Sequence, residues 1–279
     1  MRRTWVRKAL MTMCAMCAMA TLLGAGAAAA TPDPALRGQL EQLAKARVFF
    51  AHQSVGGNLI EGLQALARDN GVALQVRDVA RDPSVPNQTF GHVFVGENGK
   101  PLAKLDEYKD RLAKQQSAPP ELAMVKLCYL DFTASTDPKA VFARYQADLA
   151  ALRTQLPTTR FVHVTTPLTT IESGPKAWLK RLIGRTPWGV VENQKREQYN
   201  LLMRNAYAGR EPLFDLAKME STAEDGSPTL TTSGDARTPA LTPAYTSDGS
   251  HLNPHGERVA ARSLAGVLAQ ALASRPAAP

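Results

Sequence analysis

The pattern of apolar and polar positions divides the chain into strands that alternate with helices. The apolar run at 47–51 ends in small and polar residues, and leucines at helical spacing follow it. We therefore expect a buried strand, a tight turn and a helix over about 55–68. Further apolar stretches predict strands at 72–76, 122–130, 161–165 and 213–216. The stretch at 122–130 is nearly all apolar, which is typical of a central parallel strand covered on both faces.

Helix start signals and apolar stripes place helices between these strands. Asp137-Pro138 and Asn253-Pro254 each combine a capping side chain with a proline in the first helical turn. The expected helices cover about 39–46, 55–68, 103–115, 138–156, 192–208 and 254 onward. The pattern also predicts long loops at 82–102 and 219–246 and an insertion at 172–191.

The alternation of strand and helix predicts an α/β fold, in which a parallel sheet with right-handed crossovers carries helices on both faces. In such sheets the functional site lies outside the carboxyl ends of the strands. The turn after the strand at 47–51 and the loop after the strand at 213–216 both open onto that edge. Ser54, on the first turn, can therefore meet Asp248 and His251, although nearly two hundred residues separate them.

The first thirty residues have the three parts of a secretory signal peptide. Four basic residues near the start precede an apolar run, which ends in a segment of Gly and Ala up to Ala30. We expect cleavage after Ala30, which leaves residues 31–279 as one secreted or periplasmic α/β domain with no stable transmembrane anchor. The alternative interpretation is a membrane anchor, but the apolar run is short and ends in small residues.

Charge and cysteine content exclude some classes of function. The 279-residue chain has 33 Lys and Arg against 25 Asp and Glu, a net charge of +8. The predicted signal holds four of the basic residues and no acidic one, so 29 basic against 25 acidic residues leave +4, and a nucleic-acid partner is not expected. Of the three cysteines only Cys128 remains after cleavage, and its apolar strand predicts a buried thiol rather than a disulfide.

The insertion at 172–191 combines basic and large apolar side chains. The two kinds are interleaved along it: Lys176, Lys180, Arg181 and Arg185 with Trp178, Leu179, Leu182, Ile183 and Trp188. The favoured interpretation is an outer helix that packs its Trp and Leu side chains on the domain. The pattern is also that of a lid, a membrane-surface helix or a contact for an anionic polymer.

Ser54, His251 and Asp248 are the residue types of a nucleophilic site. A serine hydroxyl is a poor nucleophile without an adjacent base, and His251 can be that base. Asp248, three residues earlier in the same turn, can orient the imidazole and stabilise its charged form. An Asp-x-x-His pair alone is a weak signal. Its position before the last helix, together with a serine after the first strand, is far more specific.

These residues resemble the terminal motif blocks of the SGNH (GDSL-like) hydrolase superfamily. His52-Gln53-Ser54 is similar to the first block and the segment 248–251 to the last, and the resemblance covers roughly residues 45–273. It implies a three-layer α/β/α fold with a five-stranded parallel, flavodoxin-like sheet. It also implies hydrolysis or transfer of ester groups, with Ser54 as nucleophile, His251 as base and Asp248 as its partner. The expected partner is a small-molecule or glycan ester substrate, such as an acylated carbohydrate.

The middle blocks depart from the pattern of the family. The resemblance implies a glycine after the second strand and an asparagine after the third as oxyanion donors, but residues 128–131 after the third strand are Cys-Tyr-Leu-Asp. We expect the Gly96 N–H and the Asn98 side chain to supply the oxyanion hole instead. His52-Gln53 also stands where the family has Gly-Asp. Because one lost oxyanion donor costs on the order of 10²–10³ in rate, weak or lost activity is the alternative.

Other interpretations stand beside this one. Ser54 can also be an ordinary helix N-cap, and Asp248 and His251 can simply satisfy backbone groups of their loop. The main alternative function is a non-catalytic protein that binds carbohydrate or envelope components on the same fold. No metal or other cofactor is expected, and the sequence leaves the oligomeric state open. A metal site would have to use histidines whose spacing matches no compact ligand motif: His52, His92, His251 and His255.

Overall fold

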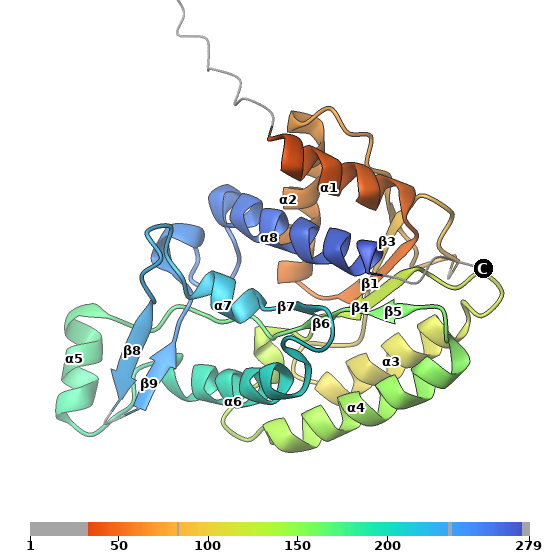
Figure 1. The fold of residues 1–279 in the computed structure, drawn as a ribbon. Helices are drawn as coiled ribbons and strands as arrows, with labels where there is room; N and C mark the ends of the chain where they lie inside the picture. Colours follow the sequence, from red (N-terminus) through yellow and green to blue (C-terminus); the bar gives the residue numbers. More distant parts are fainter. Residues whose placement is uncertain (1–32, 83, 234–235, 275–279) are drawn as a thin grey trace, which may run out of the picture. The chain divides into compact units, whose positions relative to one another are not determined.

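Strand β1 (Val48–His52) lies at the centre of a five-stranded parallel sheet (Figure 1). The structure is a computed structural model, and it describes residues 33–82, 84–233 and 236–274. The neighbours of β1 are β3 (Phe90–Phe94) and β4 (Leu122–Val125). With β2 (Val76–Asp78) and β5 (Arg160–Phe161) at the edges, the strand order is β2-β3-β1-β4-β5. All five β1 residues are buried, because both faces of the sheet are covered.

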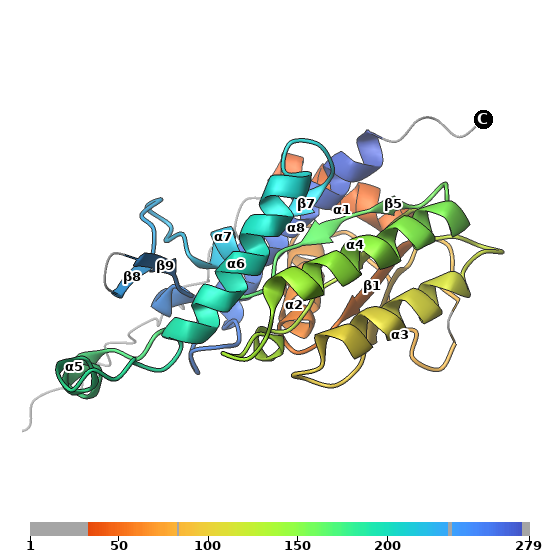
Figure 2. The same ribbon diagram turned by 90° about the horizontal axis from the view of Figure 1, so that it is seen from below.

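Helices cover both faces of this sheet (Figures 1 and 2). Alternate β1 side chains enter two separate cores: Val48 and Phe50 point into the first, and Phe49 and Ala51 into the second. The predicted α/β fold with three layers, α/β/α, is therefore confirmed. The first core is closed by α1 (Pro34–Lys45), α2 (Val55–Asp69) and α8 (Pro254–Ala273), and the second by α3 (Pro101–Ala113), α4 (Pro138–Gln155) and α6 (Val190–Tyr207).

Strand β3 lies inside the stretch 82–102, where the sequence predicted only a loop. The five-residue strand has glycine and histidine in its middle, and these obscure the apolar pattern of a buried strand. Gly91 is required there, because a Cβ would lie 2.8 Å from a methyl group of Val85, which packs on the strand. The strand predicted at 72–76 is shifted as well, since β2 pairs with β3 only from Val76 onward.

The fourth predicted strand changes its partner at Val162. The Val162 N–H still donates to a β4 carbonyl (2.9 Å), whereas the His163 N–H donates to the carbonyl of Pro212 (2.9 Å). From this point the chain pairs as β6 (His163–Val164) with β7 (Leu213–Phe214) in a second, two-stranded parallel sheet. The fifth predicted strand thus exists, but β3 takes its place in the five-stranded sheet.

Helices α2 and α8 approach each other closely at Gly62. A Cβ at this position would lie 2.3 Å from the carbonyl oxygen of Glu257 and 2.8 Å from the Cβ of Ala261. The missing side chain therefore lets the backbones of the two helices touch. The predicted N-caps are confirmed for two long helices, since side-chain oxygens of Asp137 and Asn253 accept first-turn N–H groups of α4 and α8.

The predicted loop at 219–246 and the insertion contain short regular elements. Helix α7 (Leu216–Glu220) runs into the loop, and β8 (Leu230–Ser233) pairs antiparallel with β9 (Ala236–Pro239) within it. The insertion forms α5 (Gly174–Leu182). Its Trp and Leu side chains are exposed, so the predicted packing of an outer helix on the domain is wrong.

The predictions for Cys128 and for the N-terminal segment have different outcomes. Cys128 is a free, buried thiol, as predicted. The predicted signal peptide, residues 1–30, lies outside the described residues. Of the helices that the structure describes, none is long and apolar enough to cross a membrane.

Candidate active site

Ser54 lies on the turn between β1 and α2, at the carboxyl edge of the sheet. Its backbone has φ 44° and ψ −104°, outside the regions that residues with a Cβ normally occupy. Such a conformation costs about 1–3 kcal/mol and persists only where neighbouring contacts fix it. The Gln53 side chain provides two of these contacts, since its Nε2 donates to the carbonyls of Val95 (2.9 Å) and Gly96 (2.8 Å).

Two backbone N–H groups beside the Ser54 hydroxyl make no hydrogen bond among the described residues, and of the two residues Ser54 is partly exposed whereas Val55 is fully buried. The next two donors along the chain are engaged, because Gly56 donates to the Gln53 carbonyl (2.9 Å) and Gly57 to the Ser54 carbonyl (2.7 Å). The N–H groups of Ser54 and Val55 have no acceptor in the part of the chain that the structure describes. Both open helix α2, where the helix dipole favours a negative charge. The N–H of Ser54, on the partly exposed residue, is therefore the candidate donor to an oxyanion formed next to this hydroxyl.

A continuous hydrogen-bonded chain joins Ser54, His251 and Asp248. Ser54 Oγ lies 2.5 Å from His251 Nε2, and His251 Nδ1 lies 2.7 Å from Asp248 Oδ2. Partial burial alone would raise the pKa of Asp248. Hydrogen bonds from the backbone and ring of His251 and from the Ser250 N–H outweigh this effect and hold the pKa well below its usual range. Asp248 is thus a fixed carboxylate that favours a proton on His251 Nδ1 and leaves Nε2 to accept from the serine hydroxyl.

Contacts from two sides hold the His251 loop in place. On α2, Asn58 Oδ1 accepts the N–H of Leu252 (3.3 Å), and Asn58 Nδ2 donates to the Glu257 carboxylate on α8 (2.7 Å). On the other side, the Gly249 carbonyl accepts the N–H of Thr170 (2.8 Å). The loop is therefore fastened both to the helix that begins after Ser54 and to the start of the insertion.

The structure corrects the role predicted for Gly96. Its N–H donates to Glu107 Oε2 (2.7 Å), so a carboxylate already occupies the group that the sequence assigned to an oxyanion. Asn98 is exposed, and its Oδ1 accepts from Lys104 Nζ (3.1 Å). The oxyanion role of Asn98 stays a prediction. The N–H of Ser54 is the better candidate, because it adjoins the hydroxyl itself and has no acceptor among the described residues.

A buried ion pair organises the sheet edge beside these groups. Lys104 Nζ lies 2.7 Å from Asp131 Oδ1, and both side chains are fully buried. The Asp131 carboxylate also accepts the N–H groups of Gly99 (2.9 Å) and Cys128 (2.7 Å). The pair therefore ties the turn after β3 to the turn after β4.

Tyr129 adjoins His251 and Arg196 adjoins Tyr129, although the sequence did not assign either residue to the site. The rings of Tyr129 and His251 meet edge to face, with centroids 5.8 Å apart. The Arg196 guanidinium carbon lies 5.6 Å from the centre of the Tyr129 ring, and its Nε donates to the Tyr129 carbonyl (3.0 Å). The one feature of the sequence that could have pointed to Arg196 is that an arginine stands on the buried face of helix α6. Nothing in the local pattern links that arginine to Tyr129, because α6 is far along the chain.

His52, two residues before Ser54, is a core residue. Its side chain is fully buried, and its Nε2 lies 3.1 Å from His92 Nδ1. Burial, and next the nearby charge of Lys126, lowers the pKa of His52 to about 2, so its ring is neutral. A Cβ at Gly56 would lie 2.4 Å from the His52 side chain, and the glycine therefore makes room for the ring.

The remaining histidines lie in unrelated surroundings. His163 is buried between Tyr145, whose hydroxyl lies 2.7 Å from its Nδ1, and Glu211. His255 is exposed and pairs with Glu224 at 3.2 Å. Over the described ranges no group of three or more His, Cys, Asp or Glu side chains is arranged to hold a metal ion.

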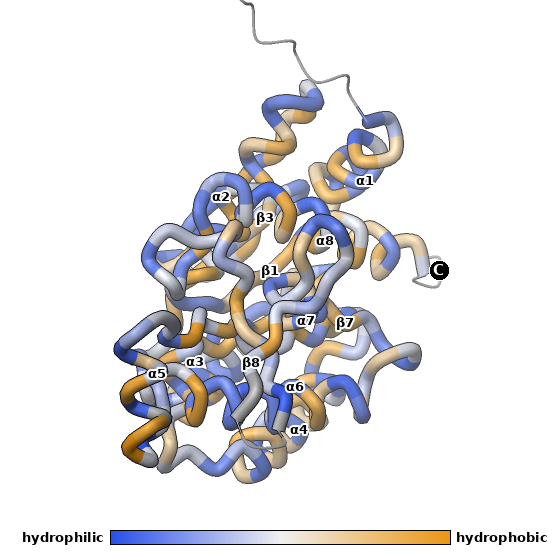
Figure 3. Tube along the Cα trace, turned by 90° about the vertical axis from the view of Figure 1, so that its left-hand side faces the viewer, coloured by the Kyte–Doolittle hydropathy of each residue, from blue (hydrophilic) through white to orange (hydrophobic). Residues whose placement is uncertain are grey.

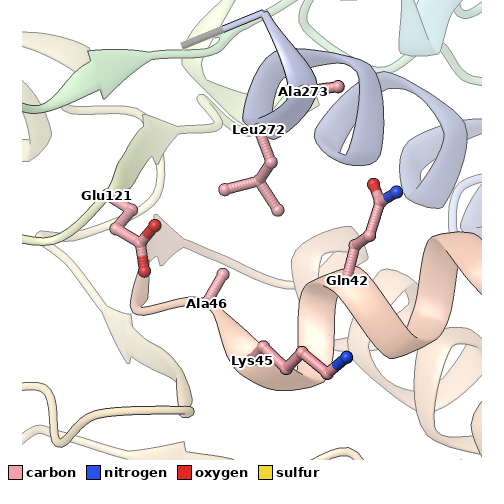
Figure 4. Close-up of a pocket in the computed structure, with 6 residues that line it drawn as sticks. All are labelled: Gln42, Lys45, Ala46, Glu121, Leu272 and Ala273. Atoms are coloured by element: carbon pink, nitrogen blue, oxygen red, sulfur yellow. The ribbon is translucent and has the colours of Figure 1, made fainter. Parts of the chain in front are cut away.

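A pocket of about 280 Å³ lies at the opposite edge of the sheet (Figure 4). Ala46 and Glu121 line it, and they lie just before the first residues of β1 and β4. The pocket therefore opens at the amino ends of the strands, whereas Ser54 lies at their carboxyl ends. The other lining residues are Gln42, Lys45, Leu272 and Ala273.

Comparison with solved structures finds proteins of similar fold. One is the periplasmic domain of a lipopolysaccharide acetyltransferase of Salmonella ser. Paratyphi A, with 14% identity over 84% of this chain and 87% of that chain and a TM-score of 0.46. Another is a protein from Parabacteroides merdae assigned as a GDSL-like lipase, with 12% identity, 80% and 95% coverage and a TM-score of 0.44. A third, from Slackia heliotrinireducens, is assigned as an SGNH hydrolase, with 14% identity, 79% and 97% coverage and a TM-score of 0.41.

The sequence itself gives no such match. No protein-family model matches it, and no curated protein matches it significantly. The likeness to the solved structures concerns the fold. The chain is similar in fold to SGNH and GDSL-like hydrolases, the superfamily that its terminal motif blocks resemble.

Proposed function

We propose that this protein is a serine ester hydrolase or acyl transferase that works through an acyl-enzyme on Ser54. The observation that carries the proposal is the hydrogen-bonded chain from Ser54 Oγ through His251 to Asp248, with links of 2.5 and 2.7 Å. A hydroxyl this close to an imidazole nitrogen can lose its proton as it attacks a carbonyl. Asp248 then stabilises the imidazolium that forms.

The proposed reaction has two halves. Ser54 Oγ attacks the ester carbonyl carbon, its proton passes to His251 Nε2, and the carbonyl oxygen becomes an oxyanion facing the N–H group of Ser54. The bond to the alcohol then breaks, and the alcohol leaves with the proton from His251. Water, or a hydroxyl of an acceptor, next gives its proton to His251 and attacks the acyl group. Ser54 recovers that proton as the acid or the new ester is released.

The surroundings of Ser54 support a small ester as the substrate class. Two exposed apolar side chains, Phe94 and Leu130, stand at the carboxyl edge and offer contacts for an acyl group. The His251 side chain is 41% exposed, so a polar alcohol such as a sugar can reach the site from solvent. We propose an acylated carbohydrate or another small ester, acted on outside the cytoplasm after removal of the predicted signal.

Labelling with a serine-directed fluorophosphonate tests the assignment. We expect covalent labelling of the wild-type protein and none of Ser54→Ala. We also expect hydrolysis of an aryl acetate that falls on the order of 10⁴-fold or more in Ser54→Ala and in His251→Ala. His255→Ala, which changes an exposed histidine, is the matched control and should retain full activity.

The alternative is a non-catalytic protein that binds carbohydrate or envelope components. It is favoured by one observation, the engagement of the Gly96 N–H by Glu107, which removes a donor that the resemblance implies. A wild-type protein that neither labels nor turns over an aryl acetate, but binds a glycan equally well as wild type and as Ser54→Ala, would establish this alternative. Equal labelling of Ser54→Ala would refute the nucleophile itself.

A further inference from the structure

The insertion exposes its apolar side chains to solvent. Trp178 is 63% exposed, Leu182 67% and Trp188 54%, and Leu179 and Ile183 are similarly exposed. Five of the ten large apolar side chains that are exposed in the described chain therefore lie in one short segment. Ala177, by contrast, is fully buried. This concentration is unlike the single exposed apolar residues that occur on any protein surface.

Hydrogen bonds join Glu172 and Trp188, near the two ends of the insertion. The Glu172 N–H donates to the Trp188 carbonyl (3.1 Å), and the Glu172 carboxylate accepts from Lys180 Nζ (2.5 Å) and from the Trp188 N–H (3.1 Å). We call residues 173–188 the α5 segment. Figures 1 and 2 show α5 beyond the β8–β9 hairpin and away from the five-stranded sheet, and α5 packs closely against no other described helix or strand.

The charge of the α5 segment has one sign. Four basic residues lie between 173 and 188, and no acidic residue does. Lys176 and Arg185 are exposed, and orange and blue positions alternate along this part of the chain in Figure 3. Trp and Leu side chains beside Lys and Arg are the composition of helices that lie in the interface of an anionic bilayer. A second copy of the chain is a poorer occupant, because the two segments would bring like charges together.

We propose that the α5 segment docks on an anionic lipid surface. Trp178, Leu182 and Trp188 enter the headgroup region, where tryptophan is favoured, and Lys176 and Arg185 meet lipid phosphates. The hydrogen bond between Thr170 and Gly249 joins the base of the insertion to the loop of His251. The docking does not depend on the proposed function.

Vesicle binding tests this proposal, and the chain provides its own probe. It contains three tryptophans, Trp5, Trp178 and Trp188, so in a Trp5→Phe background all tryptophan emission comes from the α5 segment. The protein is purified from a secreting host, and its N-terminus is determined by mass spectrometry. We expect sedimentation with phosphatidylglycerol-containing vesicles and a blue shift of emission, and weaker binding to phosphatidylcholine vesicles. Ser54→Ala should bind equally well.

Variants separate the apolar from the electrostatic contribution. Lys176→Glu/Arg185→Glu should weaken binding by more than about tenfold, because each basic side chain near an anionic surface contributes about fivefold. Trp178→Ser/Leu182→Ser should lose the blue shift from Trp188 and weaken binding about tenfold or more. Matched controls are Lys114→Glu/Lys139→Glu and Leu201→Ser, which change exposed residues elsewhere and should bind within about twofold of wild type.

Three results would overturn the proposal. The first is that the folded wild-type protein does not bind anionic vesicles. Unchanged thermal midpoints would show that the variants are folded as well. The second is concentration-dependent dimerisation that Trp178→Ser/Leu182→Ser abolishes while vesicles have no effect, which would assign the surface to a second copy. The third is tight binding of a soluble anionic polysaccharide without a blue shift, which would assign it to an anionic polymer.

Discussion

The side chain of Asn58 on α2 accepts a hydrogen bond from the backbone N–H of Leu252, the residue that follows His251 (3.3 Å). Asn58 also donates to Glu257 at the start of α8 (2.7 Å). One side chain thus sets the distance between the helix that begins after Ser54 and the loop that carries His251. The Ser54–His251 hydrogen bond depends on this distance.

Asn58→Ala should therefore reduce turnover more than it reduces stability. We expect kcat for an aryl acetate to fall about tenfold or more, because displacements of about 1 Å at a catalytic pair have effects of this size. The free energy of unfolding should fall by only about 1–2 kcal/mol. Steady-state kinetics and urea denaturation measure the two effects. Asn205→Ala, at an exposed amide on α6, is the control, and an unchanged kcat in Asn58→Ala would remove the positioning role.

Removal of one partner from the Lys104–Asp131 ion pair should be strongly destabilising. Both side chains are fully buried, so Asp131→Ala leaves an uncompensated charge and frees the N–H groups of Gly99 and Cys128. We expect a loss of about 3–5 kcal/mol in the free energy of unfolding.

The double variant Lys104→Met/Asp131→Leu provides the matching test of this pair. It should be less destabilised than Asp131→Ala, because no unpaired charge remains. Urea denaturation of the wild type, Lys104→Met, Asp131→Leu and the double variant gives the coupling energy. Additive losses would show that the pair does not act as a unit.

At position 54 we expect glycine to give a more stable protein than alanine, because of the backbone conformation of Ser54. With φ 44°, a residue with a Cβ is strained there, whereas glycine is not. Ser54→Gly should therefore be more stable than Ser54→Ala by about 1 kcal/mol, although both should lack activity. Thermal denaturation of the two variants decides this, and equal midpoints would mean that the turn is not strained.

Gly62 and Gly57 form a matched pair within α2. A Cβ at Gly62 would lie 2.3 Å from the Glu257 carbonyl oxygen, whereas nothing lies within 4 Å of a Cβ at Gly57. We expect Gly62→Ala to reduce the free energy of unfolding by about 1–3 kcal/mol, because α8 must move. Gly57→Ala should instead be neutral or stabilising by up to about 1 kcal/mol, since alanine favours the helix. If both variants had the same midpoint, α2 and α8 would not pack as described.

Acidification should reduce stability through the buried His163. Burial lowers the pKa of His163 to about 4 from its ordinary value of 6.5. Between these values the unfolded chain binds a proton at this residue and the native chain does not. Acid therefore lowers the free energy of unfolding. The stability that depends on a neutral His163 ring is fully present above pH 6.5 and is lost as the pH falls towards 4. One pKa unit corresponds to about 1.4 kcal/mol, which gives a loss of about 2–3 kcal/mol over this range.

The slope of stability against pH tests this prediction. His163→Gln should be less stable than wild type at neutral pH but should show a flatter decline on acidification. His255→Gln, at an exposed histidine, should keep the wild-type slope. A His163→Gln variant with an unchanged slope would assign the acid sensitivity to other groups. Buried His52, whose pKa is also lowered, is the first of these.

The sequence by itself determined the α/β class and the place of the candidate site. The strand at 47–51, the caps Asp137 and Asn253 and the last helix are local signals, because capping and apolar periodicity act within a few residues. The order of strands then brings Ser54, His251 and Asp248 to one edge, and the structure places them in hydrogen-bonding distance. Their catalytic role stays a proposal.

Only the tertiary structure decided which groups are engaged by distant partners. Strand β3 could not be predicted, because Gly91 and its neighbour interrupt the apolar pattern and the pairing with β1 is long-range. The Gly96 N–H is engaged by Glu107, and that bond depends on where α3 lies. The exposure of Trp178 has the same cause: an apolar stripe shows that a helix has an apolar face, but the arrangement of the other elements decides whether that face is covered.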